Sequence, residues 1–486
     1  MTNKVLLSIC PLIFVFCQAV SATTYDADNA SFTAVSTAID LASDGDTVTI
    51  PTGTATWGSA ITIPTGVTLQ GAGVGNTVIS TSSHIVLVNM SDNSRLTAVE
   101  FGDAGVLNTN TVGWRLDHCK FTAVGTNRTG IRTFWTTKDM WGLIDNNEFV
   151  NFTILISSVD IYNDARWFQT LSLGDSATVY IEDNTFSNDT LPPQVVDANH
   201  SGMYVFRYNT VNDGYFEAHG GSDSRGTRRW EIYRNTINND FDNFAYSQTM
   251  NIRGGTGVIF DNISSGTQGE ASNAWSFADG RYTGGQGGTY SGFCDGTSDW
   301  DTKPHPATDD SLLCSDSIGA GPDTILGPST LLVDHPELPH YDQYSVPAYL
   351  WGNTRDSGYF NFRVAATAVA LIVEDRDFYI DGSLSGTISG GGVSSDVLAS
   401  IPASCTVGQG YWATDQGNWN KTPGANQGVL YKCTSTDTWT EYYTPYTYPH
   451  PLTVDDGLIK VSHINSGGLT ISNIGSGNLT ISNIGD

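Results

Sequence analysis

The sequence predicts an all-β fold built as a stacked solenoid, a parallel β-helix, and three observations lead to this prediction. A short phrase, in which an apolar strand residue is followed by polar residues, Asn and another apolar residue, recurs every 25 to 37 residues. Each repeat holds two or three short β-rich runs and no long apolar stripe of helical period. A period of this size is typical of stacked repeats, in which like residues lie above one another. The recurring Asn positions are Asn147, Asn184, Asn209, Asn235 and Asn262, and Cys119 takes the same position in an earlier copy.

The recurring Asn suits a tight turn, because Asn tolerates left-handed backbone geometry and its amide bonds to neighbouring backbone groups. Stacked Asn side chains are also able to hydrogen-bond to one another along the solenoid axis. Phe, Ile and Val are expected to stack on their own kind in the interior.

The N-terminus and the composition indicate an exported protein. Residues 1–22 contain Lys4, an apolar run from Val5 to Val20 and small residues at the end, which is typical of a cleaved secretory signal. The run is too short to favour a membrane span. A net charge of −28 argues against nucleic acid and anionic membranes as partners. We therefore expect a secreted, extracellular protein.

Five cysteines remain after the predicted cleavage, and an exported chain favours their pairing. Neighbours in sequence give the pairs Cys294–Cys314 and Cys405–Cys433. Cys119 lies in a strand-turn repeat and is predicted to be a buried free thiol.

After the signal, the chain divides into three parts, the first of which contains an insertion. Residues 23–385 are predicted to form the β-helix, with an amphipathic helix over residues 31–42 that covers its open N-terminal end. A Gly-, Asp- and Pro-rich stretch, about 266–349, is predicted to be a lateral insertion. Residues 386–460 are rich in Trp and Tyr, which either stack on sugar faces or cover the open C-terminal end of the solenoid. Residues 461–486 repeat Leu-Thr-Ile-Ser-Asn-Ile, and these strands either fray, pair with the body or pair with another chain.

The beginning of the predicted solenoid resembles a known superfamily. Gly45-Asp-Thr-Val-Thr-Ile-Pro51 and Gly66-Val-Thr-Leu-Gln-Gly-Ala-Gly73 follow the predicted helix, in the order seen in pectate-lyase-like proteins. The resemblance covers residues ~30 to ~380 and implies a right-handed parallel β-helix with an N-terminal cap helix. Trp114-Arg-Leu-Asp117-His118 is similar to the Trp-Ile-Asp-His motif of pectate lyases. The second motif of those lyases, Arg-x-Pro-x-x-Arg, is absent, and a structural role for Asp117 and His118 remains open.

One segment between two repeats is dense in groups that can do chemistry. Arg binds carboxylates in bidentate pairs, and His or Tyr can move a proton, so this segment is a candidate subsite for a uronate. The alternative is that Arg228 and Arg229 pair with acids and fix a long loop. The predicted catalytic residues are His219, Arg225 and Arg228, and the predicted substrate-binding residues are Arg229, Tyr215, Asp223 and Glu217.

Acidic residues after two successive Asn turns are candidate calcium ligands. Calcium takes six to eight oxygen ligands, and lyases that resemble this chain hold the ion with Asp and Glu. Stacked coils would bring such acids within about 5 Å of one another. The candidates are Asp213, Asp240 and Asp242, and solvated turn acids are the alternative.

Two functions follow from the sequence. The first is a polysaccharide lyase that acts on an acidic glycan. The resemblance and the Arg-rich segment favour this function. A glycoside hydrolase is less favoured, because the polygalacturonase-like fragments Ala218-His219-Gly220 and Asn251-Ile-Arg253 lack an upstream Asn-Thr-Asp triplet. The second is a non-catalytic surface protein that binds glycans or self-associates through its C-terminal repeats.

Overall fold

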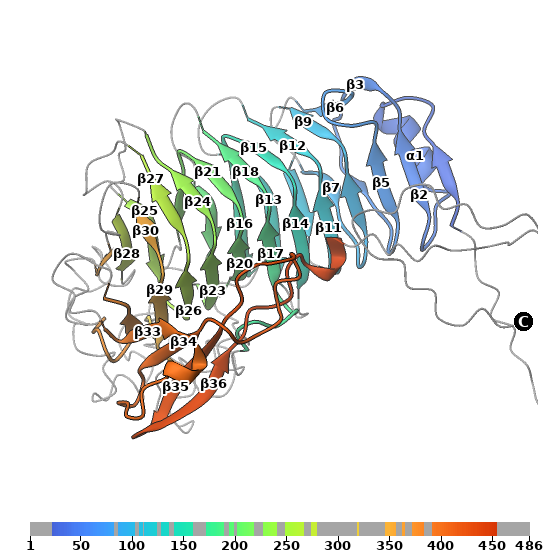
Figure 1. Cartoon of the computed structure of the whole chain (residues 1–486). Coiled ribbons are helices and arrows are strands. Elements are labelled where there is room, and N and C mark those ends of the chain that lie inside the picture. The colour runs from blue at the N-terminus through green and yellow to red at the C-terminus, as the bar shows by residue number, and fades with distance from the viewer. Residues whose placement is uncertain are drawn as a thin grey trace, which may run out of the picture.

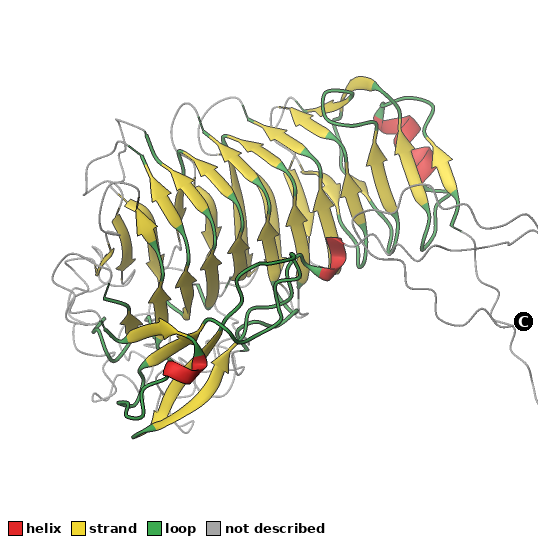
Figure 2. Ribbon diagram, viewed as in Figure 1, coloured by secondary structure: helices red, strands yellow, loops and turns green. Residues whose placement is uncertain are grey.

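The computed structural model describes residues 22–81, 86–102, 106–109, 111–123, 128–135, 140–158, 172–188, 194–198, 202–217, 227–240, 248–266, 274–278, 318–319, 346–355, 362–364, 372–382 and 391–453. Three long parallel sheets, A, B and C, are wound from successive coils, and each coil adds one strand to each sheet (Figure 1). This is a parallel β-helix, and the arrangement is consistent with the predicted right-handed coil. The mostly β composition is evident in Figure 2.

The strands follow one another in the same order in every coil. Sheet A comprises β1 (Thr24–Asp26), β2 (Thr47–Ile50), β5 (Thr68–Gly71), β8 (Arg95–Thr97), β11 (Val112–Asp117), β14 (Trp141–Asp145), β17 (Val179–Glu182), β20 (Met203–Arg207), β23 (Arg229–Tyr233), β26 (Thr256–Phe260), β29 (Ala348–Trp351) and β32 (Phe378–Ile380). Sheet B comprises β3 (Gly53–Thr56), β6 (Thr77–Ser80), β9 (Glu100–Gly102), β12 (Lys120–Thr122), β15 (Glu148–Val150), β18 (Thr185–Ser187), β21 (Thr210–Asn212), β24 (Thr236–Asn238), β27 (Ile263–Ser265) and β30 (Thr354–Arg355). Sheet C comprises β4 (Ile61–Thr62), β7 (Val86–Asn89), β10 (Val106–Thr109), β13 (Arg128–Trp135), β16 (Phe152–Ser158), β19 (Gln194–Ala198), β22 (Tyr215–Glu217), β25 (Gln248–Arg253), β28 (Ala274–Ala278) and β31 (Phe362–Val364).

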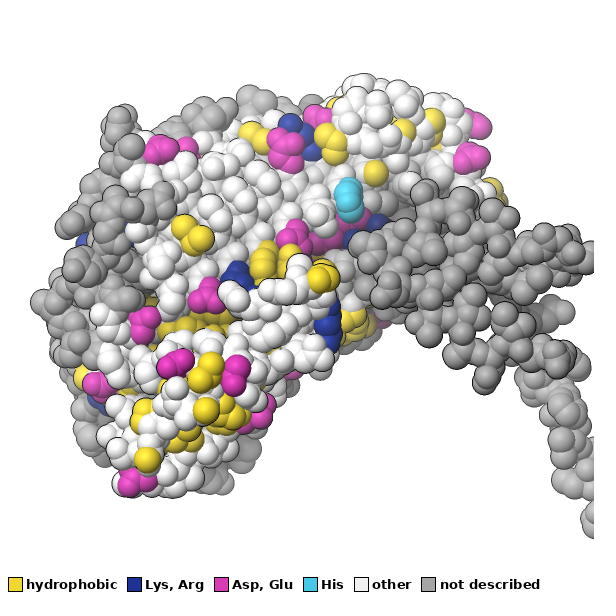
Figure 3. Space-filling view, viewed as in Figure 1, with side chains coloured by type: hydrophobic (Ala, Val, Ile, Leu, Met, Phe, Trp, Pro, Cys, Tyr) yellow, Lys and Arg dark blue, Asp and Glu magenta, His cyan; other side chains and the backbone are white. Residues whose placement is uncertain are grey.

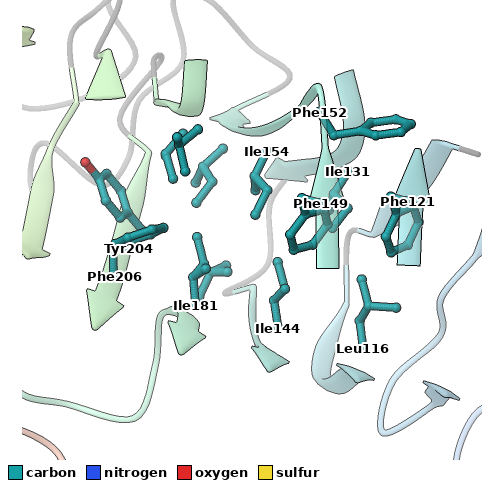
Figure 4. Packing of buried hydrophobic residues seen from close by; sticks show 14 of the residues in the cluster. Leu116, Phe121, Ile131, Ile144, Phe149, Phe152, Ile154, Ile181, Tyr204 and Phe206 are labelled. Carbon is teal, nitrogen blue, oxygen red and sulfur yellow. The ribbon is translucent and has the colours of Figure 1, made fainter. Parts of the chain in front are cut away.

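Like residues stack in the core, as the repeats predict. In sheet B the rings of Phe101, Phe121, Phe149 and Phe186 stack with centroids 4.9–5.3 Å apart. In sheet A the parallel register places an aliphatic or aromatic side chain above the next in each coil, as Leu116, Ile144, Ile181 and Phe206 do (Figure 4). Period-2 strands stacked in register therefore bury one continuous apolar column per sheet.

The recurring Asn residues form a buried ladder between sheets A and B. The side-chain amide of Asn147 donates to Asn184 Oδ1 at 3.0 Å, and the same bond repeats from Asn184 to Asn209 and from Asn209 to Asn235. The predicted axial bonding is thus confirmed. The prediction that the recurring Asn adopts the left-handed backbone is wrong. The residue before each Asn adopts it, for example Asp183, with φ 57°. Because the Asn amide already bonds to the strand carbonyls around it, the preceding residue makes the turn.

The predicted N-terminal helix is α1 (Phe32–Ile39), whose N-cap Ser31 accepts from the Ala34 N–H. Its residues Val35, Ala38 and Ile39 are buried in the core at the end of the stack. The predicted insertion begins too early, because β28 lies within it and continues sheet C. Ile318 also returns to the core and pairs with Gly255.

The aromatic-rich segment forms a small module over residues 391–453. Its sheet comprises β33 (Val393–Asp396), β34 (Gly410–Ala413), β35 (Val429–Ser435) and β36 (Thr438–Tyr443), accompanied by the short 3-10 helices η3 (Leu398–Ser400) and η4 (Pro451–Thr453). The disulfide Cys405–Cys433 closes it, as predicted, and Cys119 is a buried free thiol. Cys294 and Cys314 lie outside the described residues.

The module packs on the outer face of sheet A, alongside the solenoid (Figure 1). Trp412, Trp419 and Tyr443 are buried against sheet A side chains such as Tyr233 and Phe260. Neither predicted position for these three rings is correct, because they face a lateral surface of the solenoid and are closed to a sugar. The predicted repeat tail, residues 461–486, and all but the last residue of the predicted signal, residues 1–22, lie outside the described residues.

Candidate functional site

The outer face of sheet C gathers polar and charged residues on three adjacent strands. Asp197 of β19 pairs in register with Glu217 of β22, and Glu217 pairs with Asn251 of β25. Val196 and Phe216, next to them along the chain, are fully buried in the core. Because side chains alternate along a strand, Asp197 and Asn251 face outward, and both are half-buried.

Two further residues belong to the same face. Arg253 follows Asn251 by two residues and is half-buried, while Ile252 between them is in the core. Tyr215 precedes Glu217 by two residues, pairs in register with Gln194, and is 4% exposed. Neighbouring strands lie about 4.8 Å apart and residues along a strand about 3.3 Å apart, so Asp197 and Arg253, two strands and two residues apart, are roughly 12 Å from one another across the sheet. A carboxylate, an amide and a guanidinium therefore share one surface.

Asp197 and Arg253 were missed as site residues from the sequence. Their signal was weak: each is a single charged residue at an outward position of a strand between two apolar residues. Their relation to one another depends on the register across loops of different length, which the sequence does not give.

The predicted Arg cluster is divided by the structure. Arg228 and Arg229 are 0% and 1% exposed, and Arg229 belongs to β23 in sheet A, away from sheet C. The Arg229 guanidinium donates to the Ser172 carbonyl and to both Asp175 carboxylate oxygens, at 3.1 and 3.3 Å. Its burial and these bonds to loop 172–175 support the structural alternative, in which an Arg fixes a loop.

The neighbouring acid has a structural role as well. Glu231 is fully buried and accepts the Gly174 N–H at 2.9 Å and the Tyr443 hydroxyl at 2.8 Å. Burial raises the pKa of this carboxyl, against the opposing effect of Arg229. Glu231 thus ties both a loop and the C-terminal module to sheet A.

The remaining predicted residues of this segment lie outside the described part of the chain. These are His219, Asp223 and Arg225, and of Glu217 the backbone alone is described. Their proposed roles stay predictions.

The predicted calcium ligands lie together only in part. Asp213 and Asp240 are on adjacent coils, and the Asp240 N–H donates to Asp213 Oδ1 at 2.7 Å. Asp240 Oδ2 accepts the Asn238 amide at 3.1 Å. Asp242 lies outside the described residues, and no group of three or more Asp, Glu, His or Cys side chains suited to a metal occurs among the described ones. These two acids alone do not provide the oxygen ligands that calcium needs, and calcium binding stays a prediction.

The Asp117–His118 pair lies away from sheet C, at the corner where sheet A turns toward sheet B. Asp117 is fully buried and accepts two bonds from the Arg95 guanidinium, both of 2.7 Å, and one from Thr97 at 3.0 Å. His118 Nδ1 lies 2.7 Å from Asp117 Oδ2, and the His118 side chain is 58% exposed. Figure 3 shows an exposed histidine on this face beside acidic and basic side chains. The buried carboxylate is primarily a partner for Arg, which favours the structural role left open above.

No protein-family model matches the sequence, and no curated protein matches it. Solved structures resemble its fold distantly. An alginate lyase from Paenibacillus sp. FPU-7 is 12% identical, with 53% of this chain and 94% of that chain covered and a TM-score of 0.34. A PL6-family alginate lyase is 11% identical (76% and 52% covered, TM-score 0.35). The pectin methylesterase PemA from Erwinia chrysanthemi is also 11% identical (45% and 90% covered, TM-score 0.29). The chain is thus distantly similar to polysaccharide-active β-helix enzymes, and at these values no argument about its activity rests on the likeness.

Proposed function

We propose that this protein is a secreted enzyme that cleaves an acidic polysaccharide by β-elimination, with the outer face of sheet C as its active site. The observation that carries the proposal is that Asp197, Asn251 and Arg253 lie on one face, with the backbone of Glu217 in register between Asp197 and Asn251. An extended sugar chain that crosses this face would meet Asp197 on one coil and Asn251 and Arg253 on another.

Arg253 is the group that would pair with the substrate carboxylate. A protein of net charge −28 repels a polyuronate at long range, so binding needs a local cation. A guanidinium forms two parallel hydrogen bonds with a carboxylate, which neutralises it and makes the neighbouring C5 proton more acidic. Arg253 is not part of the predicted cluster, and the two arginines of that cluster that the structure describes, Arg228 and Arg229, are buried.

The elimination needs two proton transfers. A base takes the C5 proton, the electron pair forms the C4–C5 double bond, and the glycosidic oxygen at C4 leaves with a proton from an acid. His219, which follows β22 in the sequence, is the candidate for one of these transfers. Tyr215 of β22 is 4% exposed and is too buried to reach the sugar. Asp197 and Asn251 would orient the sugar hydroxyls through hydrogen bonds.

The test is ultraviolet absorbance of the unsaturated product on a panel of uronate polymers. With an active polymer identified, Arg253→Ala is expected to lower kcat/KM by 100-fold or more, because one charge-assisted contact contributes a few kcal/mol. Arg253→Lys should recover part of that loss, and Asp197→Asn should lower activity less. Arg376→Ala is the matched control, since Arg376 is a partly exposed arginine paired with Asp377, outside sheet C.

Two results would overturn the proposal: unchanged turnover in Arg253→Ala, or absence of product from the folded wild-type chain on every polymer. Binding without cleavage would instead favour the non-catalytic glycan-binding alternative.

A further inference from the structure

The N-terminal end of the solenoid has a free sheet edge with a groove beside it. β1 is the terminal strand of sheet A, and among the described strands it pairs with β2 alone. The Ala27 N–H and the Thr23 carbonyl bond to β2. Since alternate residues of a parallel strand bond to the same side, the backbone groups of Thr24 and Asp26 face the free edge.

The groove lies between this edge and helix α1. It measures ≈ 460 Å³ and is lined by Tyr25 and Asp26 of β1 and by Thr33, Thr37 and Leu41 on the helix side. Leu41 is 62% exposed and is the large aliphatic side chain of the helix side, whose other lining residues are small or polar. An open ladder edge beside a groove has the features of a site that accepts an added strand.

We propose that the C-terminal repeat of the same chain, Leu469-Thr-Ile-Ser-Asn-Ile474 or its copy Leu479-Thr-Ile-Ser-Asn-Ile484, adds a strand to the free edge of β1. The repeat has the alternation of the first strands of the solenoid, such as Val48-Thr-Ile50 and Val67-Thr-Leu69. It would therefore extend sheet A by one strand, with Leu or Ile facing the groove.

The tail is long enough to reach β1. The module ends beside β17, where the His450 N–H donates to Glu182 Oε1 at 2.8 Å. Six strand spacings separate β17 from β1 in sheet A, which is about 29 Å. The residues between Thr453 and Leu469 span up to about 50 Å when extended.

Charge favours the tail of the same chain over that of a second copy. Residues 464–485 carry no charged side chain, so they approach the edge near Asp26 and Asp28 without repulsion. Two copies of a chain with net charge −28 repel one another. The tether also supplies a high effective concentration of the repeat at the groove.

The test is amide hydrogen exchange on the full-length protein. We expect the Thr24 and Asp26 amides to be protected, and we expect the double variant Ile471→Pro, Ile481→Pro to lose at least 10-fold of that protection, because proline there removes an amide that would face β1 and an apolar side chain that would face the groove. Thr24→Pro removes an amide that faces the free edge and should expose the repeat. Ser466→Pro is the control, since it lies before the repeats and should change nothing.

Light scattering separates the possible occupants. A monomer with protection that depends on the repeats supports the proposal. A dimer whose protection rises with concentration assigns the edge to a second copy and overturns it. Protection that persists in the double variant, or that is missing from the wild type, overturns it as well.

Discussion

Arg207 links the C-terminal module to the solenoid, and its replacement by Met tests the packing of the module on sheet A most directly. Arg207 and Glu182 are both 0% exposed, with the Arg207 Nε 2.7 Å from Glu182 Oε2. The same guanidinium donates to the carbonyls of Tyr446 and Thr447 at 2.7 and 2.8 Å. One side chain therefore links sheet A to a segment more than 200 residues away in sequence.

Arg207→Met should lower the free energy of unfolding by about 3–5 kcal/mol, because it leaves the Glu182 carboxylate buried without its cation. Glu182→Gln should lower the free energy of unfolding by less. The side-chain oxygen of Gln still accepts the His450 N–H, and the substitution removes the buried negative charge. In the Glu182→Gln background the Arg207→Met change should cost at least 1 kcal/mol less than in the wild type, which a double-mutant cycle measures.

The assay is urea unfolding followed by tryptophan fluorescence, because Trp412 and Trp419 lie in the interface between module and solenoid. Lys120→Met is the matched control: Lys120 and Glu148 form a similar pair between coils, at 2.8 Å, but their side chains are 26% and 45% exposed. An exposed pair contributes about 1 kcal/mol or less.

The pH dependence provides a second check on Arg207→Met. Burial raises the pKa of Glu182 even with Arg207 present, and loss of the cation raises it further. A carboxyl with a raised pKa binds protons more readily in the folded state, so its effect on stability becomes more unfavourable as the pH rises. The variant should therefore recover stability between pH 8 and pH 5. If Arg207→Met lowers the free energy of unfolding by less than about 0.5 kcal/mol, or by the same amount in both backgrounds, Arg207 does not stabilise the protein through Glu182.

Three further predictions concern stability. Burial raises the pKa of Asp183, which accepts the Tyr448 hydroxyl, to about 6. The free energy of unfolding should therefore fall as the pH rises from 4 to 6, and it should fall by less in Asp183→Asn. Urea midpoints across that window measure the difference. Cys119→Asn fills the first position of the Asn ladder and should raise the melting temperature, with about 1 kcal/mol from the added hydrogen bonds; a lower melting temperature would show that the position does not accept an amide. Replacing Cys405 and Cys433 by Ser opens a loop of 28 residues and should cost about 3 kcal/mol, with faster proteolysis of the module as the readout.

The coil repeat was predictable because its signal is local. Asn184, the apolar residue before its turn and Phe186 after it lie within six residues, and the ladder of hydrogen bonds follows once the coils stack. The same holds for α1, whose cap Ser31 and apolar spacing lie in one short stretch. Patterns that repeat at short range determine the coil and its core.

The position of the module was not predictable for the opposite reason. Tyr180, Glu182 and Arg207 occupy outward positions of sheet A, where polar and aromatic residues usually meet solvent. Their partners come from residues 446–450 through contacts that span 239 to 268 residues. Nothing in either stretch identifies the other, so the sequence indicated aromatic density without its location.

The distribution of side chains over the three outer faces bears on where a polymer can bind. The module covers sheet A from β14 onward, and β18, β21 and β24 of sheet B present Thr, Ser and Asn. Sheet C combines Asp197, Asn251 and Arg253 on one face. Of the faces that the structure describes, sheet C therefore has the residues best suited to a charged sugar chain.

This assignment predicts an unusual salt dependence. A polyuronate approaching a protein of net charge −28 is repelled over the Debye length, about 30 Å at 0.01 M salt and 8 Å at 0.15 M. The proposed contact between Arg253 and a carboxylate would be short, and Arg253 is half-buried, so salt should screen this contact less than the long-range repulsion. The KM of wild type for its uronate polymer should therefore fall several-fold as NaCl rises from 0.01 to 0.15 M, and KM of Arg253→Ala should be higher at both concentrations. A KM that rises with salt would mean that long-range attraction dominates, and the polymer would then bind at a positively charged surface other than the outer face of sheet C.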